Sequence, residues 1–167
     1  MTLYFKKHHP NASIPQKAGP NEVGYDLTLI KLVKTYGNNT FMYDTDISVE
    51  PPNGYYTEIV PRSSLVKTGY IMTNSIGIID PTYRGTLKIC VTRIDDTLPK
   101  LTVPCKKFQL IIRKLIPSQL IEVENLSETD RGDGGFGSSD HLIINTITGI
   151  IANSERSFLT NHHNNFC

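Results

Sequence analysis

Two parts of the sequence carry residues whose types and spacing suit phosphate chemistry. Segment 131–139 reads Arg-Gly-Asp-Gly-Gly-Phe-Gly-Ser-Ser, and its glycines leave the backbone amides open to approach. Amides in such turns bind anions, the arginine offers a planar fork to a terminal phosphate, and an aromatic face can stack on a nucleobase. We predict that five of its residues bind a nucleotide: Arg131, Phe136, Gly137, Ser138 and Ser139. The alternative is a disordered glycine linker.

Asp80 is the candidate catalytic residue. It lies between Ile79 and Pro81 at the end of a predicted strand, where a carboxylate can orient and activate a water molecule. An aspartate before a proline also commonly caps a turn. Its position alone leaves both roles open.

Short strands must position these residues. The second half of 41–49 alternates in polarity, Pro51-Pro-Asn-Gly54 predicts a turn, and 55–60 predicts a returning strand. Further strands are expected over 69–74, 76–79, 86–94 and 107–115, with one helical turn over 63–67. This spacing, with Gly, Pro and Asn between the strands, predicts an all-β sandwich, jelly roll or barrel.

Length and composition indicate one ordinary globular domain. The chain has 167 residues and a net charge of +1, which gives no polyelectrolyte attraction to nucleic acid. We expect a β domain over 1–126, a flexible glycine-rich arm over 127–140 and a C-terminal extension of unknown role over 141–167. No apolar run reaches the roughly 20 residues of a membrane span, no secretory signal is evident, and three scattered cysteines suggest no disulfide framework. An intracellular protein, cytoplasmic or nuclear, is expected, with no nucleic-acid or membrane partner.

Five segments together point to a known family. They are Ala18-Gly-Pro-Asn-Glu-Val-Gly-Tyr-Asp-Leu27, Pro61-Arg-Ser-Ser-Leu65, Asn74-Ser-Ile-Gly-Ile-Ile-Asp-Pro-Thr-Tyr-Arg-Gly85, Lys106-Lys-Phe-Gln-Leu-Ile111 and 131–139. In this order and spacing they resemble the motifs of the trimeric dUTPase family, over about residues 4 to 139. The resemblance implies a jelly-roll-like fold that hydrolyses dUTP to dUMP and pyrophosphate with Mg²⁺. It also implies a homotrimer with shared active sites, in which one subunit donates its glycine arm to another.

The resemblance assigns a role to each candidate residue. Asp80 would activate the attacking water, and Tyr83 would pack under the deoxyribose and exclude a 2′-hydroxyl. The uracil would be read by Asn74, Gly77, Ile78, Ile79 and Lys88, in part through their backbones. The phosphates would be held by Arg62, Ser63, Ser64 and Gln109 together with the arm. Asp26 would hold the magnesium–triphosphate through water, since Mg²⁺ prefers oxygen ligands.

Three positions depart from the family pattern. Of two alternative functions, the first is suggested by such divergence and the second by the Arg62-Ser63-Ser64 segment, which resembles that of the homologous dCTP deaminases. Ser64 and Asp140 stand where glycines are usual, and Lys106 replaces an arginine. A regulatory protein without catalysis is one alternative, although Asp80 and the arm are both present. The other is a dCTP deaminase, which would need a glutamate where Cys90 stands and an arginine where Lys67 stands. Hydrolysis of dUTP is therefore the favoured prediction.

Overall fold

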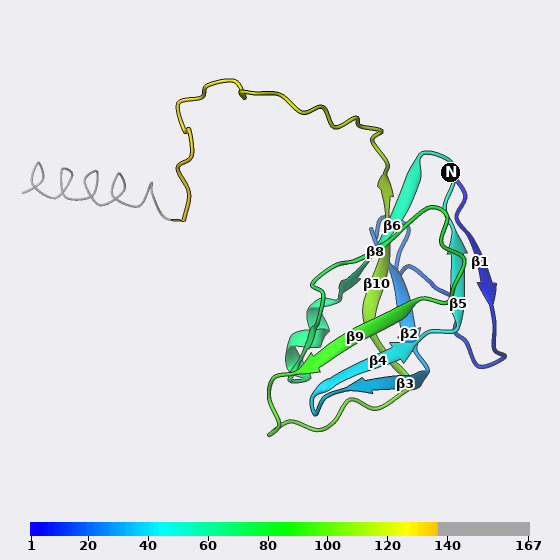
Figure 1. Ribbon diagram of the computed structural model, residues 1–167. Coiled ribbons are helices and arrows are strands. Elements are labelled where there is room, and N and C mark those ends of the chain that lie inside the picture. The colour runs from blue at the N-terminus through cyan, green and yellow to red at the C-terminus, as the bar shows by residue number, and fades with distance from the viewer. Residues whose placement is uncertain (137–167) are drawn as a thin grey trace, which may run out of the picture. The chain divides into compact units, whose positions relative to one another are not determined.

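The computed structural model describes residues 1–136 of the chain, and it divides the chain into two units. The first unit is Met1–Ser118 and contains every named strand and helix; the second begins at Gln119 (Figure 1). The expected division into a domain over 1–126, an arm and an extension remains a prediction.

The described residues form ten strands and one 3₁₀ helix. They are β1 (Tyr4–Lys7), β2 (Tyr25–Leu29), β3 (Lys31–Tyr36), β4 (Thr40–Asp44), β5 (Ile47–Glu50), β6 (Tyr55–Pro61), η1 (Ser63–Lys67), β7 (Tyr70–Met72), β8 (Gly77–Ile79), β9 (Lys88–Arg93) and β10 (Cys105–Lys114). One four-stranded sheet has the order β2-β10-β6-β8 and the other β3-β4-β9-β7, while β1 pairs with β5. All of these pairs are antiparallel.

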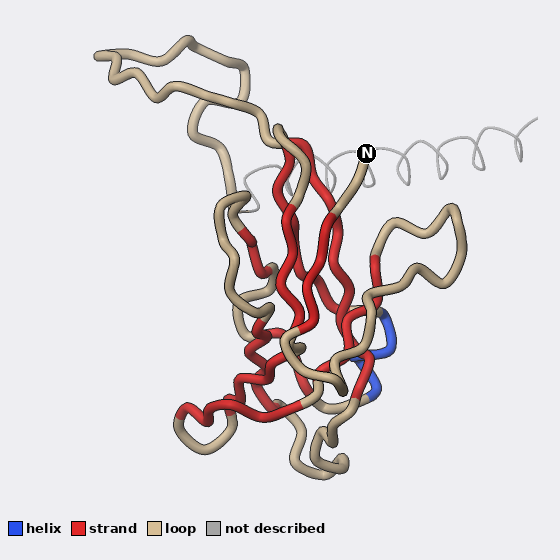
Figure 2. Tube along the Cα trace, turned by 90° about the vertical axis from the view of Figure 1, so that its right-hand side faces the viewer, coloured by secondary structure: helices blue, strands red, loops and turns tan. Residues whose placement is uncertain are grey.

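The core lies between the two four-stranded sheets. Phe108 and Leu110 of β10 belong to the same buried cluster as Ile89 and Val91 of β9. Figure 2 shows strands throughout this unit and little helix. The all-β, jelly-roll-like fold is thus confirmed. No helix in the described part of the chain is long and apolar enough to cross a membrane.

The predicted continuous strand over 41–49 is wrong in one respect. It is two strands, β4 and β5, which belong to different sheets. Asp46, between them, has a φ of 51°, and its amide donates to the Asp44 carboxylate at 2.9 Å. This left-handed residue turns the chain from one sheet to the other. Alternation of polarity continues across the corner, so the pattern did not reveal it.

The other elements match the sequence more closely. The helical turn over 63–67 is confirmed as η1, and Gly69, with a φ of 71°, follows it. A side chain at Gly69 would be strained, because this conformation is unfavourable for other residues. Strand β3 was not predicted, since it is exposed along its whole length and has no buried face to create a pattern.

Glu58, on β6, is buried and fully bonded. Its carboxylate accepts hydrogen bonds from the Tyr56 hydroxyl at 2.7 Å and from Arg113 Nε at 2.9 Å. The Tyr56 hydroxyl, and then the Arg113 guanidinium, lower the pKa of Glu58 below its usual value. This contribution to stability is present above the ordinary glutamate pKa and is lost as the pH falls through the lowered one.

Glu58→Gln is therefore expected to flatten the acid side of the stability profile. The amide cannot ionise, so the unfolding free energy should lose less between neutral and acidic pH than in the wild type. Thermal unfolding over a pH series measures this change. If the unfolding free energy of the variant depends on pH as steeply as that of the wild type, the pKa of Glu58 does not differ between the folded and unfolded chain.

Candidate active site

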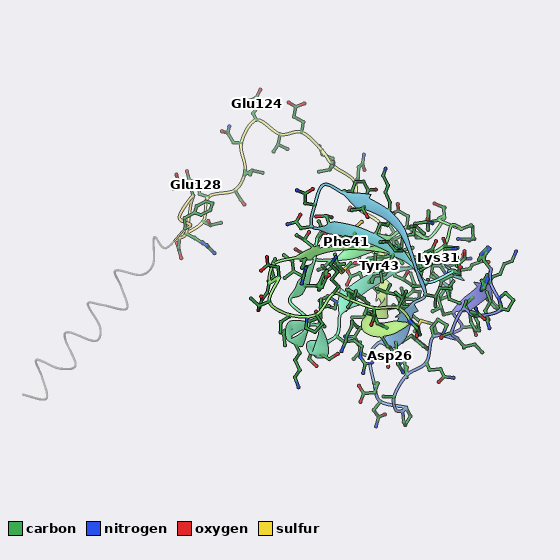
Figure 3. All side chains as sticks on the ribbon, turned by 90° about the horizontal axis from the view of Figure 1, so that it is seen from below. Asp26, Lys31, Phe41, Tyr43, Glu124 and Glu128 are labelled. Carbon is green, nitrogen blue, oxygen red and sulfur yellow. The ribbon has the colours of Figure 1, made fainter. Side chains whose placement is uncertain are left out.

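Three neighbouring strands carry or adjoin the residues predicted to hold the phosphates and the metal. Asp26 on β2 lies directly opposite Gln109 on β10, which also faces β6 just before Arg62 (Asp26 is labelled in Figure 3). The Arg62 amide donates to the Lys107 carbonyl at 2.8 Å and so fixes the chain as it leaves β6. The structure thus brings Asp26, Arg62 and Gln109 together, although they are far apart in sequence.

A cavity of about 290 Å³ lies at this point. Its lining residues come from the first, second and fourth motif segments: Ala18, Glu22, Gly24, Asp26, Arg62, Ser63 and Gln109. Ser64 is half-buried in η1, beside Ser63. The first amides of a helix lack intrahelical acceptors, so the start of η1 can offer donors to an anion.

The charges around the cavity are paired but accessible. Arg62 Nη1 lies 2.9 Å from Asp26 Oδ2, and Lys106 Nζ lies 3.7 Å from the same oxygen. Asp26 is 13% exposed, whereas Lys106 is 55% exposed. Asp26 therefore orients the arginine fork toward the cavity, whereas Lys106 lines a neighbouring cavity that shares Asp26.

Gly24 is a site residue to which the sequence reasoning gave no role. It is buried, and a Cβ built there would overlap the Gln109 side chain. A residue without a side chain is thus needed to let Gln109 reach the cavity. The signal was present in the sequence as Gly24-Tyr25-Asp26, but a lone glycine does not reveal what approaches it.

Gly24→Ala is expected to raise the KM for the nucleotide roughly 10- to 100-fold, because displacing a positioning side chain by about 1 Å can have that effect. Gly37→Ala is the matched control: its φ of 58° makes an alanine strained, yet nothing lies within 4 Å of the new Cβ. The control should lose stability without losing affinity. Equal KM values for the two variants would contradict the role of Gly24.

The residues predicted to read the base and sugar form a second group. Asp80 is exposed immediately after β8, and Asn74 and Ile78 are also exposed. The Tyr83 amide donates to the Asp80 carbonyl at 3.1 Å, which closes the turn. Gly77 and Ile79 are in β8, and Lys88 begins β9. The residues predicted to read the base and sugar thus lie along β8, the turn that follows it and the start of β9.

Asp80 and Arg62 lie toward opposite ends of β6, whereas Gly77 pairs with Ile59, nearer to Arg62. Ile79 pairs with Thr57 near the start of β6, whereas Arg62 follows its end. At about 3.3 Å per residue, β6 runs for roughly 20 Å between the position opposite Asp80 and Arg62. One copy of the chain therefore does not bring Asp80 next to the cavity that Arg62 lines.

The described part of the arm belongs to the second unit. Arg131 Nε donates to the Gly134 carbonyl at 2.8 Å, and the Gly134 amide donates back to the Arg131 carbonyl at 3.1 Å. Phe136 is fully exposed and has a φ of 49°. Gly137, Ser138, Ser139 and Asp140 lie outside the described residues. Their predicted roles, and those of the other site residues, remain predictions.

Cys90 stands where a dCTP deaminase would need a glutamate. The thiol is half-buried, and burial raises its pKa above the usual value. Such a thiol stays protonated at neutral pH and cannot serve as the carboxylate base that attack on cytosine requires. The residue therefore gives deamination no support.

Comparisons with known proteins place the sequence in context. The family model described as dUTPase matches residues 10–140. The chain is 36% identical over 134 residues to a deoxyuridine 5′-triphosphate nucleotidohydrolase of Arabidopsis thaliana, covering 80% of each chain. It is 32% identical over 152 residues to the protein of the same name from Rhodococcus erythropolis, covering 87% of this chain and 91% of the relative.

Solved structures resemble the fold as well. The Staphylococcus bacteriophage 80alpha dUTPase, solved with dUpNHpp, superposes with a TM-score of 0.68 at 26% identity, covering 83% of this chain and 98% of that one. The D95N dUTPase of S. aureus phage phi11, described with a structural Mg(II) ion, has a TM-score of 0.64 at 21% identity, covering 77% of this chain and 100% of that one. The second likeness concerns the fold alone.

Proposed function

This chain belongs to the dUTPase family, and from that premise we propose that it hydrolyses dUTP to dUMP and pyrophosphate. The observation that carries the proposal is the cavity lined by Asp26, Arg62, Ser63 and Gln109, in which a guanidinium, a hydroxyl and a side-chain amide can donate to the oxygens of a triphosphate. The reaction would limit uracil incorporation into DNA and supply dUMP for dTMP synthesis. A cytoplasmic or nuclear location is part of the proposal.

The chemical step is in-line attack of water at the α-phosphorus. Asp80 orients the water and accepts its proton while the new oxygen–phosphorus bond forms. The bond from the α-phosphorus to the oxygen that bridges the α- and β-phosphates breaks, and pyrophosphate leaves with that oxygen. Arg62, Ser63, Ser64 and Gln109 hold the charged phosphates.

The residues present fit a magnesium–triphosphate. Asp26 offers a hard carboxylate oxygen at the cavity, and Mg²⁺ is commonly held by one or two carboxylates, waters and substrate phosphates. Asp26 would hold the ion through water. When bound, Mg²⁺ screens the negative charge of the triphosphate.

Base and sugar are selected by the second group of residues. Asn74, Gly77, Ile78, Ile79 and Lys88 read the uracil, and the exposed Phe136 of the arm stacks on the base. Tyr83 packs under the deoxyribose, where a 2′-hydroxyl would clash with its ring.

The separation of Asp80 from Arg62 along β6 supports a site assembled from several subunits. Asp80 of one subunit would meet the Arg62 cavity of another, and the arm of a third would cover it, which gives a homotrimer with threefold symmetry. Roughly 20 Å along β6 is too far for Asp80 and Arg62 of one chain to meet on a single phosphate.

Mixing two inactive variants tests the shared site. Asp80→Asn and Arg62→Met chains, refolded together in equal amounts, are expected to recover about a quarter of the wild-type activity, because a random trimer pairs an intact Arg62 with an intact Asp80 that often. Each variant refolded alone is the control. No recovery in a mixture shown by native mass spectrometry to contain mixed trimers would contradict sharing.

Isotope labelling tests the chemical step. In ¹⁸O-labelled water, attack at the α-phosphorus places the label in dUMP and none in pyrophosphate. Label in pyrophosphate would mean attack at the β-phosphorus, and the proposed step would be wrong.

A further inference from the structure

The Tyr83 side chain is held at one point of the first unit. Its hydroxyl donates to the Thr86 carbonyl at 3.2 Å, and its ring lies so close to Gly85 that a Cβ there would overlap the phenol. Tyr83 is nevertheless 42% exposed, so packing alone does not fix it. The position of the ring therefore depends on the position of Thr86.

Thr86 is in turn held by a buried carboxylate. Its hydroxyl donates to Asp44 Oδ2 at 2.9 Å and accepts from Lys88 Nζ at 2.7 Å, and Lys88 Nζ also lies 3.4 Å from Asp44 Oδ2. These directions are forced, because a lysine can only donate and an ionised aspartate can only accept. The residue as a whole is 3% exposed, so Asp44 has little water to replace a lost partner.

The chain that follows Asp44 is bonded to Leu87, the residue between Thr86 and β9. The Thr45 amide and hydroxyl donate to the Leu87 carbonyl at 3.1 and 3.0 Å, and the Leu87 amide donates to the Ile47 carbonyl at 2.8 Å. The Leu87 amide belongs to the same planar peptide unit as the Thr86 carbonyl, so Ile47 holds this unit on its nitrogen side. On the Thr86 side, the unit is held by the hydroxyl bond to Asp44.

We propose that Asp44 is a positioning residue for sugar selection: through the Thr86 hydroxyl it fixes the carbonyl that anchors Tyr83 beneath the deoxyribose. The inference rests on the proposed function and adds to it a residue outside the five motif segments. Asp44 does not touch the substrate in this scheme; it acts on sugar selection through Thr86 and Tyr83, and its ion pair with Lys88 is a second link to the predicted site.

The test compares kcat/KM for dUTP and UTP in the full chain. Asp44→Asn and Thr86→Val are each expected to lower the preference for dUTP by about tenfold or more, since the ring that excludes the 2′-hydroxyl is no longer fixed. Thr86→Val keeps the side-chain shape and Asp44, so the proposal stays testable if Asp44→Asn fails to fold. In a Tyr83→Phe background, which lacks the anchored hydroxyl, Asp44→Asn should reduce the preference no further.

Lys31→Met is the matched control. Lys31 donates to the neighbouring buried Asp46 at 2.6 Å and, within the described part of the chain, does not bond to Thr86 (Lys31 is labelled in Figure 3). It should lower the melting temperature and leave the dUTP preference unchanged.

The outcomes separate the two proposals. The role of Asp44 alone is overturned if the wild-type chain hydrolyses dUTP selectively and the folded Asp44→Asn and Thr86→Val variants keep the wild-type preference. A lowered preference in Lys31→Met would also overturn it, because any loosening of the corner would then suffice. A wild-type chain without dUTP turnover overturns the proposed function itself.

Discussion

Asp80→Asn is expected to lower kcat for dUTP by about 10²- to 10⁴-fold, the usual contribution of a general base. The amide fills the same space and can still bond to water, but it cannot accept the proton that water must lose. Asp80 is exposed at the end of β8 in the single chain, so the substitution should leave the fold intact. Dissociation constants for dUTP, measured by calorimetry, should stay within a few-fold of the wild type.

A matched variant separates catalysis from general damage to the turn. Pro81→Ala changes the residue beside Asp80 and keeps the carboxylate. It should retain most of the turnover. Wild-type turnover in Asp80→Asn would show that another group activates the water.

Arg62→Lys should reduce kcat/KM for dUTP by roughly 10- to 100-fold, because lysine keeps the charge and loses the planar fork that holds phosphate oxygens in pairs. The wild-type guanidinium is held 2.9 Å from Asp26 and lines the cavity, so its fork is already oriented before the nucleotide binds. Steady-state kinetics with dUTP measures the loss.

Lys106→Met provides the comparison for Arg62. Lys106 is half-exposed and lies 3.7 Å from Asp26, so its removal should have a smaller effect than loss of the Arg62 fork. A larger effect at Lys106 would mean that the main phosphate contact is on β10 instead.

Much of the fold could be predicted, because turn residues and motif spacing mark the strands. Helix η1 lies where Pro61-Arg62 and Gly69 bound it, and β6 follows the predicted Pro51–Gly54 turn. The corner at Asp46 could not be predicted, since a positive φ at a non-glycine residue leaves no mark on the alternation of polar and apolar residues.

The site was predicted as a set of residues but not as an arrangement. Motif order does not reveal that Arg62 and Asp80 lie toward opposite ends of β6. Only the pairing of β6 with β8 shows this. Asp44 is similarly hidden from sequence reasoning, because its partners, Thr86 and Lys88, reach it across the β4–β9 pair. Cross-strand contacts depend on register, which local patterns leave open.

Pyrophosphate release from dUTP, dCTP, dTTP and UTP, each supplied with Mg²⁺ to the purified full chain, tests the central claim most directly. Rapid release from dUTP, with the other three slower by orders of magnitude, is the predicted result. Comparable release from all four nucleotides, or none from dUTP, would contradict a uracil- and deoxyribose-selective hydrolase.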